Sequence, residues 1–244
     1  MPPTDGFPRH HRFTCSEYHA LARIGVLSPD EPVELIEGQI YRKPSPTPER
    51  SACVRRLHRV LLRQANGRYT VGKLAPVTLN ETSEAVPDLT LLRARQDCGS
   101  MPYPMPEDVQ LLVEVAAATI EFDRVTKLPI YARSGIPEVW LIDLAAETVE
   151  IHQQPSETGY RHVRRLGRKD RLSPLVFPEL ELTGSDILPQ APERTPEPVG
   201  TDRWRAWLSD AERLTSEIRS RLGEDLDVDD LLAQSRKDLE NRGE

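Results

Sequence analysis

Cysteine is scarce in this chain of 244 residues, and the few cysteines follow no recognisable pattern. Cys15, Cys53 and Cys98 are odd in number and lie far apart in the sequence. They form no CxxC pair and show no metal-ligand spacing, which argues against a disulfide framework and against a zinc site. We therefore expect reduced cysteines that serve mainly in packing.

Long apolar segments are also missing. The longest apolar stretch, residues 111–120, is interrupted by Glu114 and is far shorter than the ~20 residues that a transmembrane helix requires. The N-terminal sequence MPPTDGFPRHHRF contains no apolar core of the signal-peptide type. These absences predict a soluble, cytoplasmic protein without a membrane partner.

An excess of basic residues is absent as well. The chain has 39 acidic and 32 basic residues, for a net charge of −7, which argues against a uniformly basic nucleic-acid-binding protein. A local basic groove remains compatible with that total, because the distribution of charge matters more than its sum. From position 190 onward the chain has 14 acidic and nine basic residues, a net of −5, so the preceding residues carry only −2.

Proline marks the boundary between a main domain and a tail. Residues 189–200 hold four prolines in twelve positions, and we interpret them as an extended linker. Residues 12–188 form the expected domain, preceded by a disordered stretch over 1–11. Residues 201–244 form an acidic tail whose apolar residues recur at helical spacing. We expect these tail helices to contact the main domain, a second copy or a protein partner.

The main domain has the alternating pattern of an α/β fold. The run VQLLVEVA at 109–116 is almost continuously apolar, as in a strand buried on both faces. A helical segment over 122–134 and a second apolar strand, EVWLID at 138–143, follow closely. This order predicts a βαβ unit with parallel strands. Predicted hairpins at 33–43 and 148–166 complete a mixed central sheet flanked by helices.

Shorter segments add further expected elements. The Thr14–Glu17 capping box predicts a helix, and apolar residues at helical spacing predict another over 50–65. Tyr69–Leu79 and Ala85–Leu92 have the composition of strands. Pro129 lies inside the predicted helix at 122–134, and predicts a kink or a late start there.

Two acidic residues stand out because each lies within an apolar strand. Asp88 is part of AVPDLTLL and Glu114 is part of QLLVEVAA. A lone buried carboxylate is costly, so each needs a basic side chain or a metal ion as its partner. A divalent ion such as Mg²⁺ would relieve the repulsion between two carboxylates on one sheet, and would suit phosphodiester hydrolysis. Lys127, on the following helix, is a candidate for orienting the attacking water or balancing developing charge.

Each of these residues also has a structural alternative. Asp88 is equally explained as a turn cap or an ion-paired acid, and Glu114 as the partner of an arginine. Lys127 suits an i, i+4 ion pair with Asp123 on the same helix. Taken singly, the three residues leave the choice between structure and catalysis open.

The order of these elements resembles a known family. Pro87-Asp88, Glu114 at a distance of 26 residues, a crossover helix and an apolar strand resemble the PD-(D/E)XK nuclease superfamily. VELIEGQI, APVTL, VPDLTLL and LLVEVA, followed by FDRVTKLPIYARSGIPEVWLIDL, are similar to the bacterial Uma-two family of restriction endonucleases over about residues 12–188. The resemblance implies a restriction-endonuclease-like core, Mg²⁺ or Mn²⁺ as cofactor, and cleavage of DNA phosphodiester bonds.

The resemblance also implies roles for individual residues. Asp88 matches the aspartate of the PD element, and Glu114 matches the acid of the (D/E)XK element. Ala116 stands where that motif has its lysine, and Lys127 matches a lysine that the family has moved to the next helix. Glu34 in VELIEG matches a family glutamate, either as a third acid near the metal or as support for the hairpin. The family's histidine near residue 50 is missing from PERSACVRRL.

Two clusters of basic residues are candidates for contacts with nucleic-acid phosphates. They lie on the helix over 50–65 and around the closing hairpin, and they include Arg55, Arg56, Arg59, Arg63, Arg164 and Arg165. A solvated charged face is the alternative explanation for each cluster.

The sequence therefore predicts a metal-dependent DNA endonuclease with an appended helical C-terminal tail. The rival hypothesis is a catalytically weak or inactive nuclease-fold module that binds nucleic acid or protein through its C-terminal helices. Trp204 and Trp207 give the tail an apolar face, which would also suit a homodimer.

Overall fold

The computed structural model describes residues 10–28, 30–65, 67–93 and 103–189, together with Arg213. The predicted linker over 189–200 and the tail over 201–244 therefore lie almost wholly outside the described residues, as do Trp204, Trp207 and Cys98. Most of the predicted disordered stretch over 1–11 lies outside them too. The domain boundaries consequently stay predictions.

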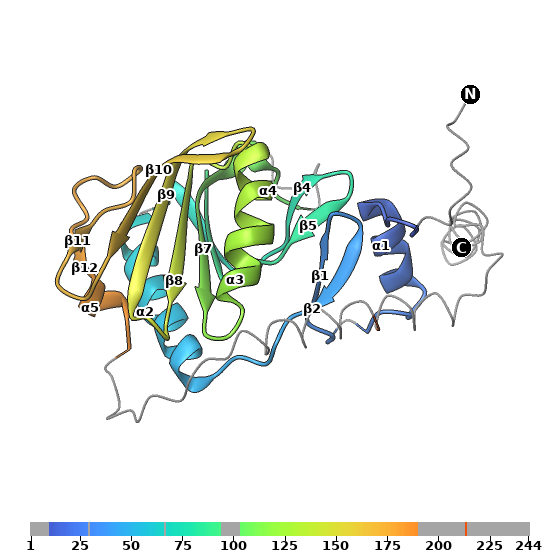
Figure 1. Ribbon diagram of the computed structural model, residues 1–244, viewed down its shortest axis with the longest axis horizontal. Helices are drawn as coiled ribbons and strands as arrows, with labels where there is room; N and C mark the ends of the chain where they lie inside the picture. Colours follow the sequence, from blue (N-terminus) through green and yellow to red (C-terminus); the bar gives the residue numbers. More distant parts are fainter. Residues whose placement is uncertain (1–9, 29, 66, 94–102, 190–212, 214–244) are drawn as a thin grey trace.

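A six-stranded mixed sheet forms the centre of the domain (Figure 1), with the strand order β10-β9-β8-β7-β6-β3. The predicted βαβ unit is present, because β7 and β8 run parallel, with Leu112 beside Val139. The other neighbouring strands are antiparallel. The strands are β3 (Tyr69–Lys73), β6 (Leu89–Arg93), β7 (Val109–Ala116), β8 (Glu138–Asp143), β9 (Thr148–Ser156) and β10 (Gly159–Leu166).

A second, four-stranded sheet has the order β2-β1-β5-β4. The predicted hairpin joins β1 and β2 through Glu37 and Gly38, whose φ angles are 48° and 77°. Positive φ at both central residues is the requirement of the tight turn that matches strand twist. The strands are β1 (Val33–Ile36), β2 (Gln39–Arg42), β4 (Val77–Asn80) and β5 (Ser83–Ala85).

Two predicted strands are each divided by a proline. Tyr69–Leu79 is not one strand, because β3 ends at Lys73 and β4 begins only after Pro76. Ala85–Leu92 is likewise split, with β5 in the small sheet and β6 in the large one, and Pro87 between them. Proline cannot donate a ladder hydrogen bond, so it favours such an exit from a sheet. The second break places Asp88 at the junction of the two sheets.

The predicted helices are present with shifted ends. Thr14 and Glu17 form the capping box of the first helix, with the Thr14 N–H donating to Glu17 at 2.7 Å. The segment predicted at 122–134 begins at 120 and passes through a π-helical turn just before Pro129, which has no N–H to donate. The helices are α1 (Cys15–Arg23), α2 (Pro48–Ala65), α3 (Ile120–Phe122), the π-turn η2 (Asp123–Lys127), α4 (Leu128–Arg133) and α5 (Gly184–Ile187).

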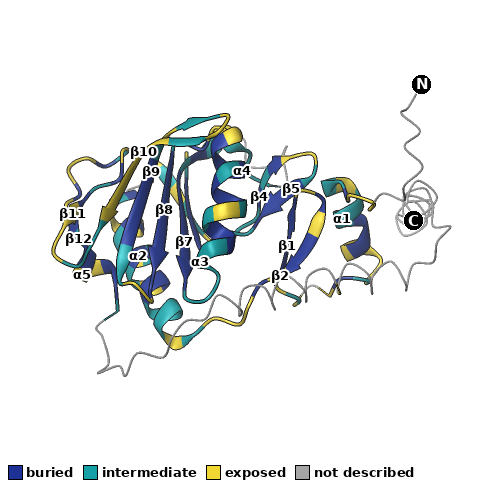
Figure 2. Ribbon diagram, viewed as in Figure 1, coloured by how far each residue is buried: buried dark blue, intermediate teal, exposed yellow. Residues whose placement is uncertain are grey.

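Two apolar clusters cover the two faces of the central sheet. Cys53, Leu57 and Leu61 of α2 pack on one face, and Ile130 and Tyr131 of α4 belong to the cluster on the other. Strand β8 is buried along its whole length, whereas edge strand β10 is largely exposed (Figure 2). Both cysteines that fall in the described ranges, at 15 and 53, are free thiols.

Three short elements complete the described fold. They are the 3-10 turn η1 (Pro106–Asp108) and the paired strands β11 (Arg171–Leu172) and β12 (Leu182–Thr183). Across the described ranges, no helix combines the length and apolar character needed to cross a bilayer.

Candidate active site

Asp88 and Glu114 meet because of the register between β6 and β7. The two strands are antiparallel and Leu89 lies beside Val113, so Asp88 falls opposite Glu114. Both side chains are buried, with only 2% and 3% of each residue exposed. These two predicted site residues are 26 positions apart in the sequence but are neighbours in the fold.

Glu34 reaches the same place from the small sheet. Its Oε2 atom accepts a hydrogen bond from the backbone N–H of Val86 at 3.0 Å. Val86 belongs to the short connection between β5 and β6 that carries Asp88. The connection between the sheets thus brings Glu34 to the acids of the central sheet, and the contact also supports a structural role for Glu34.

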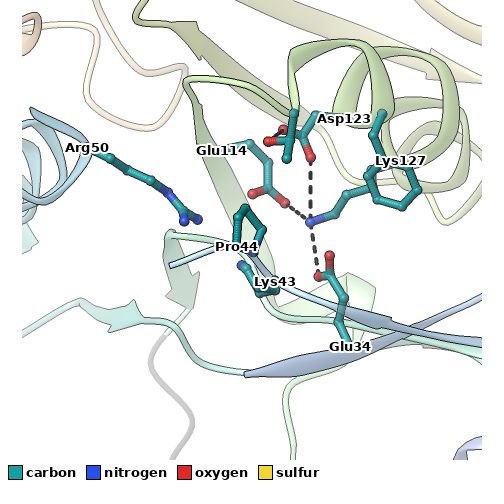
Figure 3. A pocket seen from close by; sticks show the side chains of 9 residues that line it. Glu34, Lys43, Pro44, Arg50, Glu114, Asp123 and Lys127 are labelled. Carbon is teal, nitrogen blue, oxygen red and sulfur yellow. Dashed lines mark hydrogen bonds and ion pairs between the residues drawn. The ribbon is translucent and has the colours of Figure 1, made fainter. Parts of the chain in front are cut away.

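Lys127 connects the acids that come from three parts of the chain (Figure 3). Its Nζ atom lies 2.6 Å from Glu114, 3.0 Å from Glu34 and 3.9 Å from Asp123. Burial alone would lower the pKa of the ammonium group, but the carboxylates, Glu114 first, raise that pKa above its ordinary value. Lys127 is therefore a cation rather than a proton acceptor near neutral pH. The predicted pair with Asp123 and the predicted approach to Glu114 are both present.

Glu114 is held in its ionised form. Burial would raise the pKa of its carboxyl group, but Lys127 and then Lys43 outweigh burial and hold the pKa below its usual value. The hydroxyl group of Tyr131 donates to Glu114 Oε1 at 2.6 Å. Glu114 thus combines a negative charge with a fixed orientation.

Asp88 has a different set of partners. Arg50 donates to its two oxygens at 2.8 and 3.4 Å, and the backbone N–H of Val115 donates at 2.8 Å. Burial and the nearby Glu114 raise the pKa of Asp88, while Arg50 opposes them. The ion pair expected as the structural alternative for Asp88 is therefore present, with Arg50 as the cation.

Asp123 titrates close to neutral pH. Burial, followed by the charge of Glu114, raises the pKa of its carboxyl group to about 7 from an ordinary 3.8. A carboxyl group whose pKa is higher in the folded state stabilises the fold most at acid pH, and this contribution declines as pH rises from about 4 to about 7. Thr119, which precedes α3, donates a hydrogen bond to Asp123 at 3.1 Å, so Asp123 also has a neutral partner nearby.

We expect Asp123→Asn to raise the melting temperature, and to raise it more at pH 8 than at pH 5. Asparagine cannot ionise, so the variant avoids a buried negative charge at alkaline pH while keeping an acceptor for Thr119. A gain on the order of 1 kcal/mol at pH 8 corresponds to about 2–4 °C in a chain of this size. Thermal melts of both proteins at the two pH values measure it, and equal shifts at both would contradict the assigned titration.

Three of these acids, Glu34, Glu114 and Asp123, line one pocket together with basic side chains, as seen in Figure 3. Asp88 is not among the lining side chains of this pocket, whereas its partner Arg50 is. The sequence prediction missed Lys43, Arg50 and Tyr131 as members of the site. Lys43 donates to the Val86 carbonyl oxygen. The lining residues are Glu34, Lys43, Pro44, Arg50, Glu114, Thr119, Phe122, Asp123 and Lys127.

A family model described as "Uma2: Putative restriction endonuclease" matches residues 15–185, well over half of the chain. The chain belongs to the Uma-two family. The crystal structure of a "putative nuclease belonging to DUF820" from Anabaena variabilis is similar in fold, with a TM-score of 0.57 and 22% identity over 68% of this chain and 96% of that chain. No curated protein matches the chain. Family membership and fold together support a nuclease.

In this member of the Uma-two family, Arg50 lies at the start of α2, where the expected histidine is missing. It contacts Asp88 directly. Arg50, near which the expected histidine is missing, therefore lies inside the site as the partner of a predicted metal ligand.

The carboxylates fit a hard divalent cation by their chemistry. Mg²⁺ prefers oxygen ligands and is often held by one or two carboxylates, with waters and phosphate oxygens completing its shell. Asp88 and Glu114 supply such a pair. Within the described ranges, no group of three or more His, Cys, Asp or Glu side chains forms a ready metal-binding set. In this structure Asp88 is paired with Arg50 and Glu114 is paired with Lys127.

The predicted DNA-contacting residues lie outside the pocket. At about 100° per residue, Arg55, Arg59 and Arg63 form a stripe on the exposed side of α2, with Arg59 about 180° away from Arg50. Arg56 donates to the carbonyl oxygen of Leu188 at 3.1 Å, so it also has a structural partner. The four arginines of α2 that were predicted to contact DNA thus differ in what they can contact.

Arg164 and Arg165 are exposed on β10, at the edge of the central sheet. Strands β8 and β9 separate β10 from the strand of Glu114, a distance of about 14 Å at the usual strand spacing. Arg165 also lies 3.8 Å from Glu150. Any contact of these residues with DNA would therefore be remote from the pocket.

Proposed function

We propose that this protein is a metal-dependent endonuclease that hydrolyses DNA phosphodiester bonds, with Mg²⁺ or Mn²⁺ as its cofactor. The observation that carries the proposal is a pair of buried carboxylates, Glu114 on β7 and Asp88 directly before the adjacent β6, with Lys127 2.6 Å from Glu114. Membership of a family described as restriction endonucleases supports the same reaction. The bacterial cytoplasm is the proposed location.

Asp88 and Glu114 would hold the metal, with Glu34 as a third acid beside them. When bound, the ion would polarise the phosphate and lower the pKa of a coordinated water. Glu114 is prepared for this role because Lys127 and Tyr131 hold its carboxylate ionised and oriented. The backbone N–H of Val115 donates to one oxygen of Asp88 at 2.8 Å and so fixes the orientation of this carboxylate for the same role.

Lys127 would stabilise the negative charge that develops on the phosphate. Its raised pKa keeps the ammonium group protonated, so its contribution is electrostatic. Fixed charges of this kind, already in place before the reaction, commonly lower the barrier more than any other effect in an active site. Glu34 and Asp123 would act as positioning residues, because they hold the Nζ atom from two further directions.

The direct test is a cleavage assay with the full chain on supercoiled DNA, linear duplex, single-stranded DNA and RNA. Each substrate is incubated with Mg²⁺, with Mn²⁺, and with EDTA. Metal-dependent cleavage of DNA supports the proposal, and preferential cleavage of RNA would change the substrate. No cleavage of any form, with binding of nucleic acid retained, would favour the inactive binding module.

Replacing Arg55, Arg59 and Arg63 together with glutamine tests the exposed stripe on α2. Each phosphate contact contributes about 0.9 to the slope of log affinity against log salt concentration, so we expect the slope to fall by up to about 2.7. A fluorescence-anisotropy titration at several salt concentrations, with Ca²⁺ in place of Mg²⁺, measures it. The matched variant carries glutamine at Arg164 and Arg165. An unchanged slope in either variant removes that cluster from the DNA interface.

A homodimer through Trp204 and Trp207 stays a prediction, as does a protein partner for the tail. The folded domain described above contains the complete set of proposed catalytic side chains. None of the proposed catalytic side chains comes from the tail.

A further inference from the structure

Arg50 is the least expected member of the site. It belongs to the first turn of α2, and its side chain is only 12% exposed. The other arginines proposed to contact DNA from α2 are exposed or bound elsewhere, whereas the guanidinium of Arg50 points into the pocket (Figure 3). It follows the connection from β2 to α2, where Pro44 and Pro46 are exposed, and Pro48, the first residue of α2.

The pairing of Arg50 occupies an oxygen that a metal ion would need. Its Nη2 atom donates to Asp88 Oδ1 at 2.8 Å, while Asp88 Oδ2 is held by the Val115 N–H. Arg50 lines the pocket and Asp88 does not. The guanidinium therefore lies between the carboxylate and the space where a metal ion and a phosphate would enter.

The two remaining cations of the pocket are engaged differently. Lys127 is held by the carboxylates of Glu34, Glu114 and Asp123, and Lys43 donates to the carbonyl oxygen of Val86. Arg50 has Asp88 as its ion-pair partner. A divalent cation on Asp88 would repel the guanidinium at such short range, and a guanidinium binds phosphate as readily as carboxylate, through two parallel hydrogen bonds.

We propose that Arg50 is an exchangeable partner of Asp88, which competes with the divalent cation for that carboxylate and binds a DNA phosphate once it is displaced. This inference rests on the proposed nuclease function and assigns Arg50 a substrate-binding role within it. The exchange keeps the buried acid paired at every stage. It also couples metal loading to substrate binding, because the displaced guanidinium needs an anion.

The exchange predicts opposite effects of Arg50→Gln on two binding steps. Without DNA, the variant should bind Mn²⁺ at least threefold more tightly than the wild type, because no cation has to leave Asp88. With Ca²⁺ present, it should bind duplex DNA at least threefold more weakly, because a bidentate phosphate contact is lost. A merely structural role would weaken both steps or neither.

Isothermal titration calorimetry with Mn²⁺ and anisotropy with a labelled duplex measure the two steps on the full chain. Arg133→Gln is the matched control, since Arg133 forms an exposed ion pair with Glu37 at 2.8 Å, away from the pocket lining. If Arg50→Gln unfolds, Arg50→Lys is used in its place, because lysine keeps the positive charge but cannot form two parallel hydrogen bonds. This variant should stay folded and bind DNA more weakly.

The outcomes separate this inference from the proposed function. Tighter Mn²⁺ binding together with weaker DNA binding supports the exchange. Equal or weaker Mn²⁺ binding by a folded Arg50→Gln variant overturns the exchange but leaves the nuclease intact. For the lysine variant, unchanged DNA affinity overturns the phosphate contact. A wild-type chain that binds no Mn²⁺ and cleaves no DNA overturns the proposed function, and the exchange with it.

Discussion

Asp88→Asn should reduce DNA cleavage by about 10³-fold or more. Removing one of two proposed metal ligands forfeits several kcal/mol of transition-state stabilisation, and about 4 kcal/mol corresponds to a factor of 10³ in rate. Asparagine keeps the shape of the side chain and an oxygen that can accept from the Val115 N–H, so the fold should survive. Single-turnover cleavage of a plasmid in Mg²⁺ measures the effect.

The control for this prediction is an aspartate of similar burial with no place in the pocket. Asp143 is 6% exposed and caps the turn after β8 by accepting from the N–H groups of Ala145 and Ala146. Asp143→Asn should cleave at a rate close to that of the wild type. Cleavage by Asp88→Asn within a few-fold of this control would remove Asp88 from the catalytic machinery.

Lys127→Met should lower the stability of the fold as well as abolish cleavage. The substitution leaves the acids around the Nζ atom without their shared cation, and breaking a buried ion pair in this way costs about 3–5 kcal/mol. In a chain of this size that corresponds to a fall in melting temperature of about 6–20 °C. Thermal melts at pH 7 measure the change, with Arg133→Met as a surface control that should cost less than about 1 kcal/mol.

A second substitution distinguishes buried charge from simple loss of packing. Adding Glu114→Gln to Lys127→Met neutralises one of the uncompensated acids, so the double variant should recover part of the lost stability. Equal melting temperatures for the single and double variants would mean that lost contacts, rather than unpaired charge, account for the damage.

The sequence predicts the central sheet well where the pattern is local. Strands β7 and β8 lie in continuous apolar runs, and the helix between them is close in sequence, so the parallel pair follows from general rules. The two strands that were predicted too long both contain a proline, at 76 and 87. The sequence therefore contains the proline that breaks each strand, but it does not indicate which sheet each half of the strand would join.

The candidate site depends more on tertiary structure. The placement of Asp88 opposite Glu114 follows once β6 and β7 are known to be neighbours. The contact between Lys127 and Glu34, in contrast, joins residues 93 positions apart, one on the turn η2 and one in the small sheet. No periodicity encodes such a contact. The family resemblance singled out both residues, but the contact between them comes only from the fold. Asp123, Lys127 and Tyr131 recur at four-residue steps, a helical face that points to Tyr131 as a further member of the site.

Arg50 was missed because the predicted DNA-contacting residues of this helix began only at Arg55. Its angular position separates it from Arg55, Arg59 and Arg63, and places it with the apolar residues that face the core. A basic residue on the buried side of a helix requires an acidic partner, and this signal could have indicated Asp88. The acidic tail over 201–244 lies almost wholly outside the described residues, and its role stays a prediction.

The most direct test of the central claim is the binding of Mn²⁺ to the protein in the absence of DNA, followed through the electron paramagnetic resonance signal of the free ion. The wild-type chain and Asp143→Asn should bind Mn²⁺, and Asp88→Asn and Glu114→Gln should each lose that binding while remaining folded. Undiminished Mn²⁺ binding by a folded Asp88→Asn variant would contradict the assignment of these carboxylates as metal ligands.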